Sequence, residues 1–245
     1  MSEPKEFLRE RAQASFSSRV ENNPYPGRGL VLGRDESGDW LQIYWIMGRS
    51  ENSRNRRFIS EGGELRTEPV DPTTVEDPSL IIYRAMAEQG KQYLVTNGDQ
   101  TDTLLEGIGR GETFEVSLGR REREPDEPNY TPRISGVIDL RGKAPSIFLG
   151  LLKANPADTS YTDRNFYRPA SPPNGLGLAL TTYEGDGSPL PSFSGDPLWF
   201  PTEAGPEQAI ERYWGALDAD NRVALAVKCI PASGGTSRLF LRNRY

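Results

Sequence analysis

The segment from residue 40 to residue 47, WLQIYWIM, constrains the fold of this chain more than any other feature. Its apolar side chains do not alternate with polar ones, as they would in a strand with one face in water. A nearly continuous apolar run of this length is typical of a strand that is buried on both faces. We therefore expect other parts of the chain to cover both sides of this strand.

Short apolar segments separated by turn residues make up much of the remaining chain. Twenty Pro and 25 Gly residues favour many turns between short elements over long helices. Apolar runs predict further strands at 29–33, 93–96, 134–140, 146–152, 177–183, 222–230 and 238–241, and a strand or a helix at 80–89. Helices are expected over 4–20, from Thr103 as the N-cap of a capping box, and over 206–217.

Roughly eight to ten strands with few helices predict an α+β protein with stacked sheets and helices outside them. The 245 residues favour one large domain, 1–245, over two small ones. Residues 1–24 are expected to form an N-terminal helical extension of that domain. Residues 155–201, rich in Pro and Gly, are expected to form a long loop region interrupted by one strand.

The complete absence of histidine excludes several kinds of catalytic site. Ser-His-Asp and Cys-His catalysis, zinc held by histidine and imidazole acid–base chemistry all require that side chain. Carboxylates, Tyr, Lys, Arg, amides or bound water must supply any catalysis. The sequence predicts no cofactor and no metal site.

Charge and cysteine content limit the partners and the compartment. A net charge of −6 argues against a nucleic-acid partner, and no run approaches the ~18 apolar residues of a membrane helix. The single cysteine, Cys229, fits a reducing compartment, so a cytoplasmic protein is expected. Self-association into a homo-oligomer is left open.

A basic segment follows the apolar strand. Residues 48–58, GRSENSRNRRF, contain Arg49, Arg54, Arg56 and Arg57. The planar guanidinium group suits phosphate, because it donates two parallel hydrogen bonds. The alternative is a basic loop that faces solvent.

Two further polar segments are candidates for chemistry. Residues 95–103, VTNGDQTDT, join a strand to a helix N-terminus and so offer backbone N–H groups to an anion; an ordinary connection with Asx turns explains them as well. Residues 121–133 carry acidic side chains, and two neighbouring carboxylates can serve as an acid and a base. Their alternative is a surface loop of compensating ion pairs.

Several short motifs follow one another in a characteristic order. They are Gly27-Arg28-Gly29 to Gly33, Arg49-Ser50 with Arg54, Asp77-Pro78 to Tyr83, Asn97-Gly98 with Thr101-Asp102-Thr103, and Thr131-Pro132-Arg133-Ile134. In this order, over roughly residues 25 to 200, the chain resembles the archaeal-type inosine monophosphate (IMP) cyclohydrolase family.

The resemblance implies a four-layer αββα sandwich of the Ntn-hydrolase-like type, with two mainly antiparallel sheets. It also implies an enzyme of purine biosynthesis, a hydrolase of the class acting on cyclic amidines. Its reaction closes 5-formamidoimidazole-4-carboxamide ribonucleotide to IMP with loss of water. Matched position by position, the catalytic residues are Tyr83, Glu124 and Asp126. The matched substrate-binding residues are Arg49, Arg54, Asn97, Asp99, Thr101, Asp102 and Arg133.

The chain departs from the family pattern at a few of these positions. Archaeal members carry Ser-His where this chain has Asp99-Gln100, and Asn where it has Arg84. Two other functions therefore stay open. One is a nucleotide- or metabolite-binding protein of the same fold without turnover, and the other is a cyclic-amide hydrolase with another phosphorylated substrate. All three hypotheses have a small phosphorylated ligand as partner.

Overall fold

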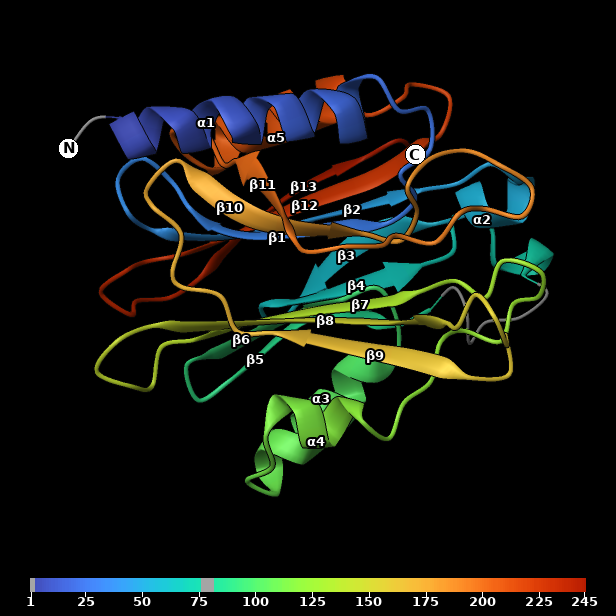
Figure 1. The fold of residues 1–245 in the computed structure, drawn as a ribbon, viewed down its shortest axis with the longest axis horizontal. Coiled ribbons are helices and arrows are strands. Elements are labelled where there is room, and N and C mark those ends of the chain that lie inside the picture. The colour runs from blue at the N-terminus through green and yellow to red at the C-terminus, as the bar shows by residue number, and fades with distance from the viewer. Residues whose placement is uncertain (1–2, 76–81) are drawn as a thin grey trace.

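The computed structural model describes residues 3–75 and 82–245, and its strands form two sheets (Figure 1). The six strands of the first sheet are β1 (Gly29–Arg34), β2 (Trp40–Met47), β10 (Leu176–Thr181), β11 (Leu198–Pro201), β12 (Arg222–Ile230) and β13 (Arg238–Asn243). Their spatial order is β11-β10-β1-β2-β12-β13. All of these neighbours pair antiparallel.

The second sheet is a meander of seven strands, in which each pairs with the next along the chain. They are β3 (Arg57–Glu61), β4 (Glu64–Glu68), β5 (Arg84–Gln89), β6 (Gln92–Thr96), β7 (Arg133–Asp139), β8 (Ser146–Ala154) and β9 (Thr162–Tyr167). Every pairing is again antiparallel. Two mainly antiparallel sheets with few helices confirm the predicted α+β class.

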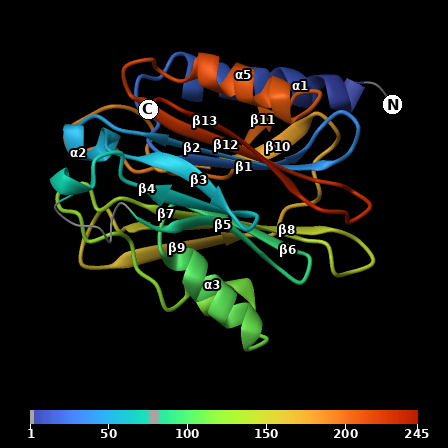
Figure 2. The same ribbon diagram turned by 180° about the vertical axis from the view of Figure 1, so that it is seen from behind.

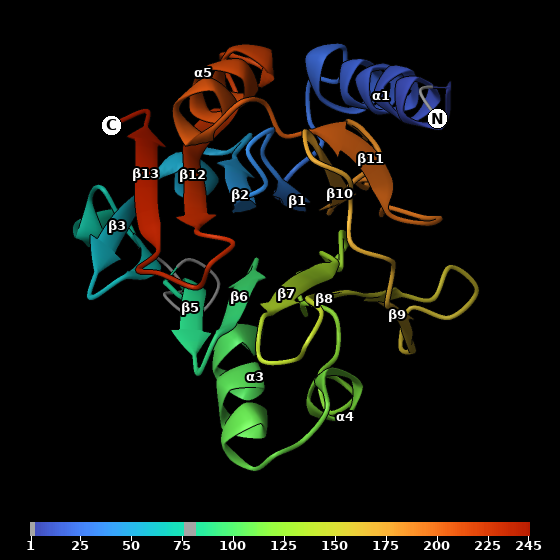
Figure 3. The ribbon, with the colours of Figure 1, turned by 90° about the vertical axis from the view of Figure 1, so that its left-hand side faces the viewer.

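Helices cover the outer faces of both sheets (Figures 1 and 3). Helices α1 (Glu3–Phe16) and α5 (Pro206–Ala216) lie on the first sheet, and α3 (Gln100–Gly109) and α4 (Phe114–Leu118) lie on the second, as the reverse view also shows (Figure 2). The short elements are α2 (Glu51–Arg54), a π-helical turn η1 (Ser17–Glu21) and a 3-10 turn η2 (Pro72–Thr74). Among the described residues, no helix combines the length and the apolar character needed to cross a bilayer.

Strand β2 is buried along its whole length, which confirms the expectation from its apolar run. Tyr44 and Ile46 face the second sheet and join the core between the sheets. Ile43 and Trp45 face the other way and pack with α1 and α5. Because successive side chains of a strand point to opposite faces, a strand between two apolar layers needs apolar residues at nearly every position.

Helix α3 begins earlier than the capping box at Thr103 predicts. It starts at Gln100, with Asp99 at the N-cap position, and Thr103 lies inside the helix. The turn that closes strand β6 starts the helix directly, because Thr101 and Asp102 already donate backbone bonds to Gly98 and Asp99. The predicted start at Thr103 is therefore wrong.

The region 155–201 is more regular than expected. It contributes three strands, β9, β10 and β11, where a loop with one strand was predicted. Both β9 and β11 lie at sheet edges. Strand β9, TDRNFY, has a weak apolar pattern, and β11, LWFP, is apolar but only four residues long. The segment 80–89 is a strand from Arg84 onward, and its first two residues lie outside the described residues.

Candidate active site

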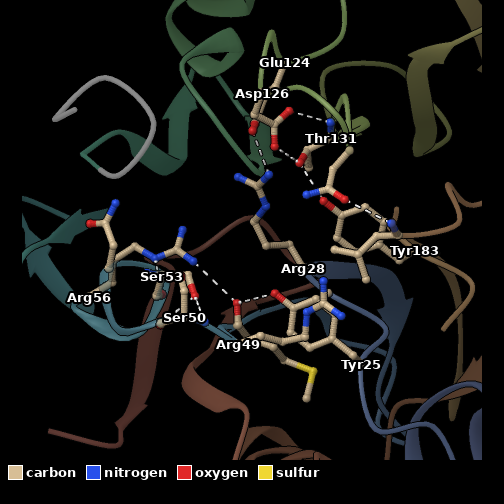
Figure 4. A pocket seen from close by; sticks show the side chains of 15 residues that line it. Tyr25, Arg28, Arg49, Ser50, Ser53, Arg56, Glu124, Asp126, Thr131 and Tyr183 are labelled. Atoms are coloured by element: carbon tan, nitrogen blue, oxygen red, sulfur yellow. Dashed lines mark hydrogen bonds and ion pairs between the residues drawn. The ribbon is translucent and has the colours of Figure 1, made fainter. Parts of the chain in front are cut away.

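A cavity of about 380 Å³ opens where the ends of several strands meet (Figure 4). Strand β1 begins there, and β2 and β10 end beside it, because Gly29 pairs with both Trp45 and Thr181. The loop that leads into β7 completes the wall. The described residues that line the cavity are Tyr25, Gly27, Arg28, Met47, Arg49, Ser50, Asn52, Ser53, Arg56, Glu124, Asp126, Asn129, Thr131, Tyr183 and Leu190.

Arg28 and Glu124 form a buried ion pair in this wall. Arg28 Nη2 donates to Glu124 Oε2 at 2.9 Å, and Arg28 Nη1 donates to the carbonyl of Asn97 at 2.8 Å. Burial alone would lower the pKa of Arg28, but the Glu124 carboxylate together with the nearby Tyr83 and Tyr44 raises that pKa well above its ordinary value. The Arg28 guanidinium is therefore charged although it is buried.

The second carboxylate, Asp126, belongs to a chain of hydrogen bonds. Its oxygens accept from the backbone N–H of Thr131 at 2.6 Å and from the Thr131 hydroxyl. The Tyr183 hydroxyl lies 2.6 Å from Thr131 Oγ1. A hydroxyl has one proton, so Thr131 donates to Asp126 and accepts from Tyr183. Burial raises the pKa of Tyr183, which keeps this phenol protonated and able to donate.

The entry of β1 fits closely against Tyr183. Gly27 has φ of 73°, and a Cβ at this position would lie 2.2 Å from Thr182 Oγ1 and 2.5 Å from the Tyr183 ring. Only glycine allows both the positive φ and this close approach. Gly27 thereby lets Arg28 enter the cavity beside Tyr183.

Arg49 lies at the outer part of the cavity, after the end of β2. It forms an ion pair with Asp186 and donates to the carbonyl of Gly187 at 3.0 Å. Its guanidinium also lies over the ring of Tyr25, 5.0 Å from the centroid. Burial raises the pKa of Tyr25 although neighbouring arginines oppose that shift, so Tyr25 is a neutral phenol.

Helix α2 brings Ser50, Ser53 and Arg56 to another part of the wall. Ser50 Oγ accepts from the Ser53 backbone N–H at 3.1 Å, and Ser53 Oγ accepts from that of Ser50 at 2.9 Å, so the two serines form a reciprocal cap. Arg56 follows directly and is only 6% exposed. Its Nε donates to the carbonyl of Ser53 at 2.9 Å.

Tyr83 lies beneath this cavity, in the core between the sheets. Its hydroxyl lies 2.7 Å from that of Tyr44 on β2. The pair is close enough to Arg28 to contribute to the raised pKa of that guanidinium. Tyr83 is not among the lining residues.

The structure brings three of the predicted site residues into the cavity wall, Arg49, Glu124 and Asp126. The predicted substrate-binding arginine Arg54 points elsewhere. It donates to the carbonyl of Gly48 at 2.9 Å and to Asn221 Oδ1 at 3.2 Å. It lines a separate shallow depression with Val70 and Tyr245.

The other predicted substrate-binding residues lie behind the wall, where each has protein partners. Asn97 accepts from the N–H of Ile134 and donates to the carbonyl of Pro132, and Thr101 pairs with Thr96. Asp102 lies 3.6 Å from Arg84.

Asp99 accepts from both Arg121 and Arg133, at 2.5 and 2.7 Å. Burial would raise the pKa of Asp99, but these two arginines hold it below its ordinary value. Arg133 also donates to Gln100 Oε1 at 2.8 Å. The departures from the family pattern at Asp99, Gln100 and Arg84 thus occur at positions that contact protein.

Several lining residues were not identified from the sequence as site residues. Arg28 and Thr131 belong to the motifs quoted above, but they received no role. Tyr183 closes the predicted strand 177–183, and Tyr25 precedes the first strand. The signal that could have found them is their position at strand ends that meet at one sheet edge.

The chemistry available in the cavity is that of arginines, carboxylates and phenols. Three arginines and two carboxylates line it, so the lining carries an excess of positive charge although the whole chain carries −6. No cluster of three or more His, Cys, Asp or Glu side chains suited to a metal ion is found within residues 3–75 and 82–245. The arrangement can bind an anion and move protons beside it.

Comparison with known proteins points to one family. A family model described as IMP cyclohydrolase-like protein matches residues 25–234. A protein named IMP cyclohydrolase from Methanopyrus kandleri is 28% identical over 172 residues, which cover 69% of this chain and 79% of that protein. Proteins of the same name from Methanothrix thermoacetophila and Methanococcus maripaludis are 31% and 29% identical over 121 and 118 residues. These two matches cover 48% and 46% of this chain, and they span 59% and 58% of the relatives.

Proposed function

Because this chain belongs to the IMP cyclohydrolase-like family, we propose that it closes 5-formamidoimidazole-4-carboxamide ribonucleotide to IMP with loss of water. The observation that carries the proposal is the cavity itself, where two carboxylates and a neutral phenol lie among three arginines. Its volume lies within the range of small-molecule sites. The substrate is an anion, and its cyclisation needs no imidazole group.

We also propose that the two sheets and their helices form one domain of the αββα, Ntn-hydrolase-like type. The order of layers supports this, since helices cover the outer face of each sheet (Figure 3). In this proposal the cavity lies at one end of the paired sheets, where β1 and β7 contact each other. The loops that extend from the strand ends supply the functional groups.

Ring closure forms a bond between the carboxamide nitrogen and the formyl carbon of the same molecule. The formyl oxygen then leaves as water and takes one proton from each of the two nitrogens. Holding the substrate folded supplies much of the rate, because both reacting groups are already in one molecule. The protein must therefore fix a conformation, accept a proton from the attacking nitrogen and deliver one to the departing oxygen.

Glu124 is the proton acceptor in this proposal. Its Oε2 is held by Arg28, whereas its Oε1 accepts no hydrogen bond among the described residues, and Glu124 lines the cavity. The attacking nitrogen becomes cationic as the new bond forms, so a carboxylate is a strong enough base to take its proton. Arg28 fixes the orientation of that carboxylate.

Asp126 and Tyr183 serve the departing oxygen. Asp126 orients Thr131, and Thr131 accepts the hydrogen bond from Tyr183, whose raised pKa keeps the phenol protonated. In the reaction the Tyr183 hydroxyl turns its single proton from Thr131 to the departing oxygen. Tyr83 lies beside Arg28 and contributes in this proposal by helping to keep that guanidinium charged. Asn97, Asp99, Thr101, Asp102 and Arg133 support the wall, most directly where the Asn97 carbonyl holds Arg28.

The decisive test is turnover. The protein is incubated with the formamido ribonucleotide, and IMP formation is followed by absorbance. We expect catalysis by the parent protein and a loss of about 100-fold or more for Glu124→Gln, as for removal of a general base. Glu122→Gln is the matched control, because Glu122 is an exposed carboxylate in the same loop.

Two results would contradict the proposal. Absence of turnover with retained binding of IMP would leave a nucleotide-binding protein. Equal losses in Glu124→Gln and Glu122→Gln would show that general charge in this loop matters, and that Glu124 has no special role.

A further inference from the structure

Arg56 differs from the other arginines of the cavity, because no carboxylate in the described part of the chain pairs with it. Arg28 is paired with Glu124, and Arg49 is paired with Asp186. Arg56 contacts no carboxylate within residues 3–75 and 82–245. Its protein partners there are two backbone carbonyls, those of Ser53 at 2.9 Å and Met47 at 3.4 Å.

A buried charge without a counter-ion is expensive, so its presence needs an explanation. Arg56 is only 6% exposed, so its guanidinium has lost most of its hydration. Carbonyl dipoles compensate only part of that loss. Its Nη1 has no acceptor among the described residues, yet it is not sealed off from the cavity. A guanidinium with unused donors facing a cavity is suited to bind an anion.

A second donor lies beside it. Ser50 Oγ accepts the backbone N–H of Ser53, and its own proton has no acceptor among the described residues. Figure 4 shows Arg56 together with Ser50 and Ser53 on one side of the cavity, with Glu124 and Asp126 beyond Arg28. The free donors and the carboxylates thus lie in different parts of the wall.

We propose that Arg56, with the Ser50 hydroxyl, is the anchor for the 5′-phosphate, and that this fixes the direction in which the nucleotide lies. The inference rests on the proposed function, because it takes the ligand to be a nucleoside monophosphate. A phosphate monoester carries a charge of about −1.5 to −2, so it is repelled from Glu124 and Asp126. The heterocycle then lies toward those carboxylates and Tyr183, where its two reacting groups meet the proton carriers.

Binding measurements by calorimetry with IMP and inosine test this assignment, since the two ligands differ only in the phosphate. The parent protein is expected to bind IMP more tightly than inosine. Arg56→Ala is expected to weaken IMP binding by about 10- to 100-fold, the usual effect of losing a charged hydrogen bond, and to leave inosine binding unchanged. Arg56→Lys, which keeps the charge but not the fork, is expected to lie between the two.

Arg57→Ala is the matched control. Arg57 is adjacent in sequence, but it is exposed and pairs with Glu68 on the neighbouring strand. We expect this variant to bind both ligands as the parent does. Unchanged inosine binding by Arg56→Ala also shows that the variant is folded.

Two outcomes overturn the anchor. One is an Arg56→Ala protein that keeps the parent preference for IMP over inosine, and the other is an equal loss for both ligands. If the parent catalyses ring closure in either case, the proposed function stands without this anchor. If Arg56→Ala selectively loses IMP but the parent shows no turnover, the anchor stands and the enzymatic proposal falls. A parent that does not bind IMP overturns both.

Discussion

The hydroxyl groups of Tyr44 and Tyr83 lie 2.7 Å apart and join the two sheets beneath the cavity. Tyr44 is on β2 of the first sheet, and Tyr83 comes just before β5 of the second. Burial and the neighbouring Tyr83 raise the pKa of Tyr44 well above its ordinary value, so this phenol stays neutral. The pair connects the two sheets next to Arg28, behind the residues that line the cavity.

A double-mutant cycle measures what the pair of tyrosines contributes to stability. Tyr44→Phe and Tyr83→Phe each leave the other hydroxyl without its buried partner, and each is expected to lower the free energy of unfolding by about 1–3 kcal/mol. The double variant removes both hydroxyls and is expected to cost no more than one single variant. Urea unfolding of the four proteins provides the values. Additive losses would mean that the two phenols do not depend on each other.

The Arg28–Glu124 ion pair gives a second prediction about the free energy of unfolding. Glu124→Leu leaves a buried guanidinium without its counter-ion, so we expect a loss of about 3–5 kcal/mol in unfolding free energy. The double variant Arg28→Met with Glu124→Leu is expected to recover most of that stability, since no charge is left unpaired. Activity should remain lost in both. If the double variant is as unstable as the single one, packing rather than charge dominates at this site.

The fold was largely predictable where burial is strong. Strand β2 could be identified because both of its faces are covered, so nearly every side chain is apolar. The hairpin of β3 and β4 was not predicted, because few of its side chains are buried. Its one clear signal is Gly62-Gly63, both with positive φ, in the two-residue turn between the strands.

The site was predictable where charge is concentrated along the chain. Arg49, Glu124 and Asp126 stand in charged segments that a solvent-facing loop explains as well, and the family resemblance singled them out. The sequence could not show that Arg28 and Tyr183 lie in one site. They are more than 150 residues apart, and the pairing of β1 with β10 brings them together. Contacts of this kind depend on strand register, which no local pattern specifies.

Lys228 predicts a pH dependence of stability. Its side chain is fully buried between the sheets, and its Nζ donates to the carbonyl of Gly63 at 2.9 Å. Burial lowers the pKa of this lysine, although Glu88 opposes the shift. The folded state therefore binds fewer protons than the unfolded state at pH values between the lowered pKa and the ordinary value of about 10.4.

Stability relative to a Lys228→Met variant should consequently rise with pH in that window, by at most about 1.4 kcal/mol per pH unit. Urea unfolding of the parent and Lys228→Met at several pH values below about 10.4 measures the difference, and effects of other groups cancel in it. A difference that is constant, or that falls as the pH rises, would show that burial does not govern the protonation of Lys228.

The ion pair of Arg49 with Asp186 gives a prediction for substrate binding. The two side chains are 36% and 50% exposed, so the pair contributes less than about 1 kcal/mol to stability. Asp186→Asn should leave the unfolding free energy nearly unchanged. It also removes a negative charge from the outer part of the cavity and leaves Arg49 unpaired. Under the proposed function we therefore expect KM for the anionic formamido ribonucleotide to fall by about two- to fivefold with kcat unchanged. Raising the ionic strength should shrink this gain.

Asp196→Asn, which changes an exposed carboxylate of the same loop region away from the cavity, is the matched control and should leave KM unaltered. A higher KM in Asp186→Asn would reverse the interpretation. Asp186 would then hold Arg49 in the position that the substrate needs, and the ion pair would belong to the binding site instead of competing with it.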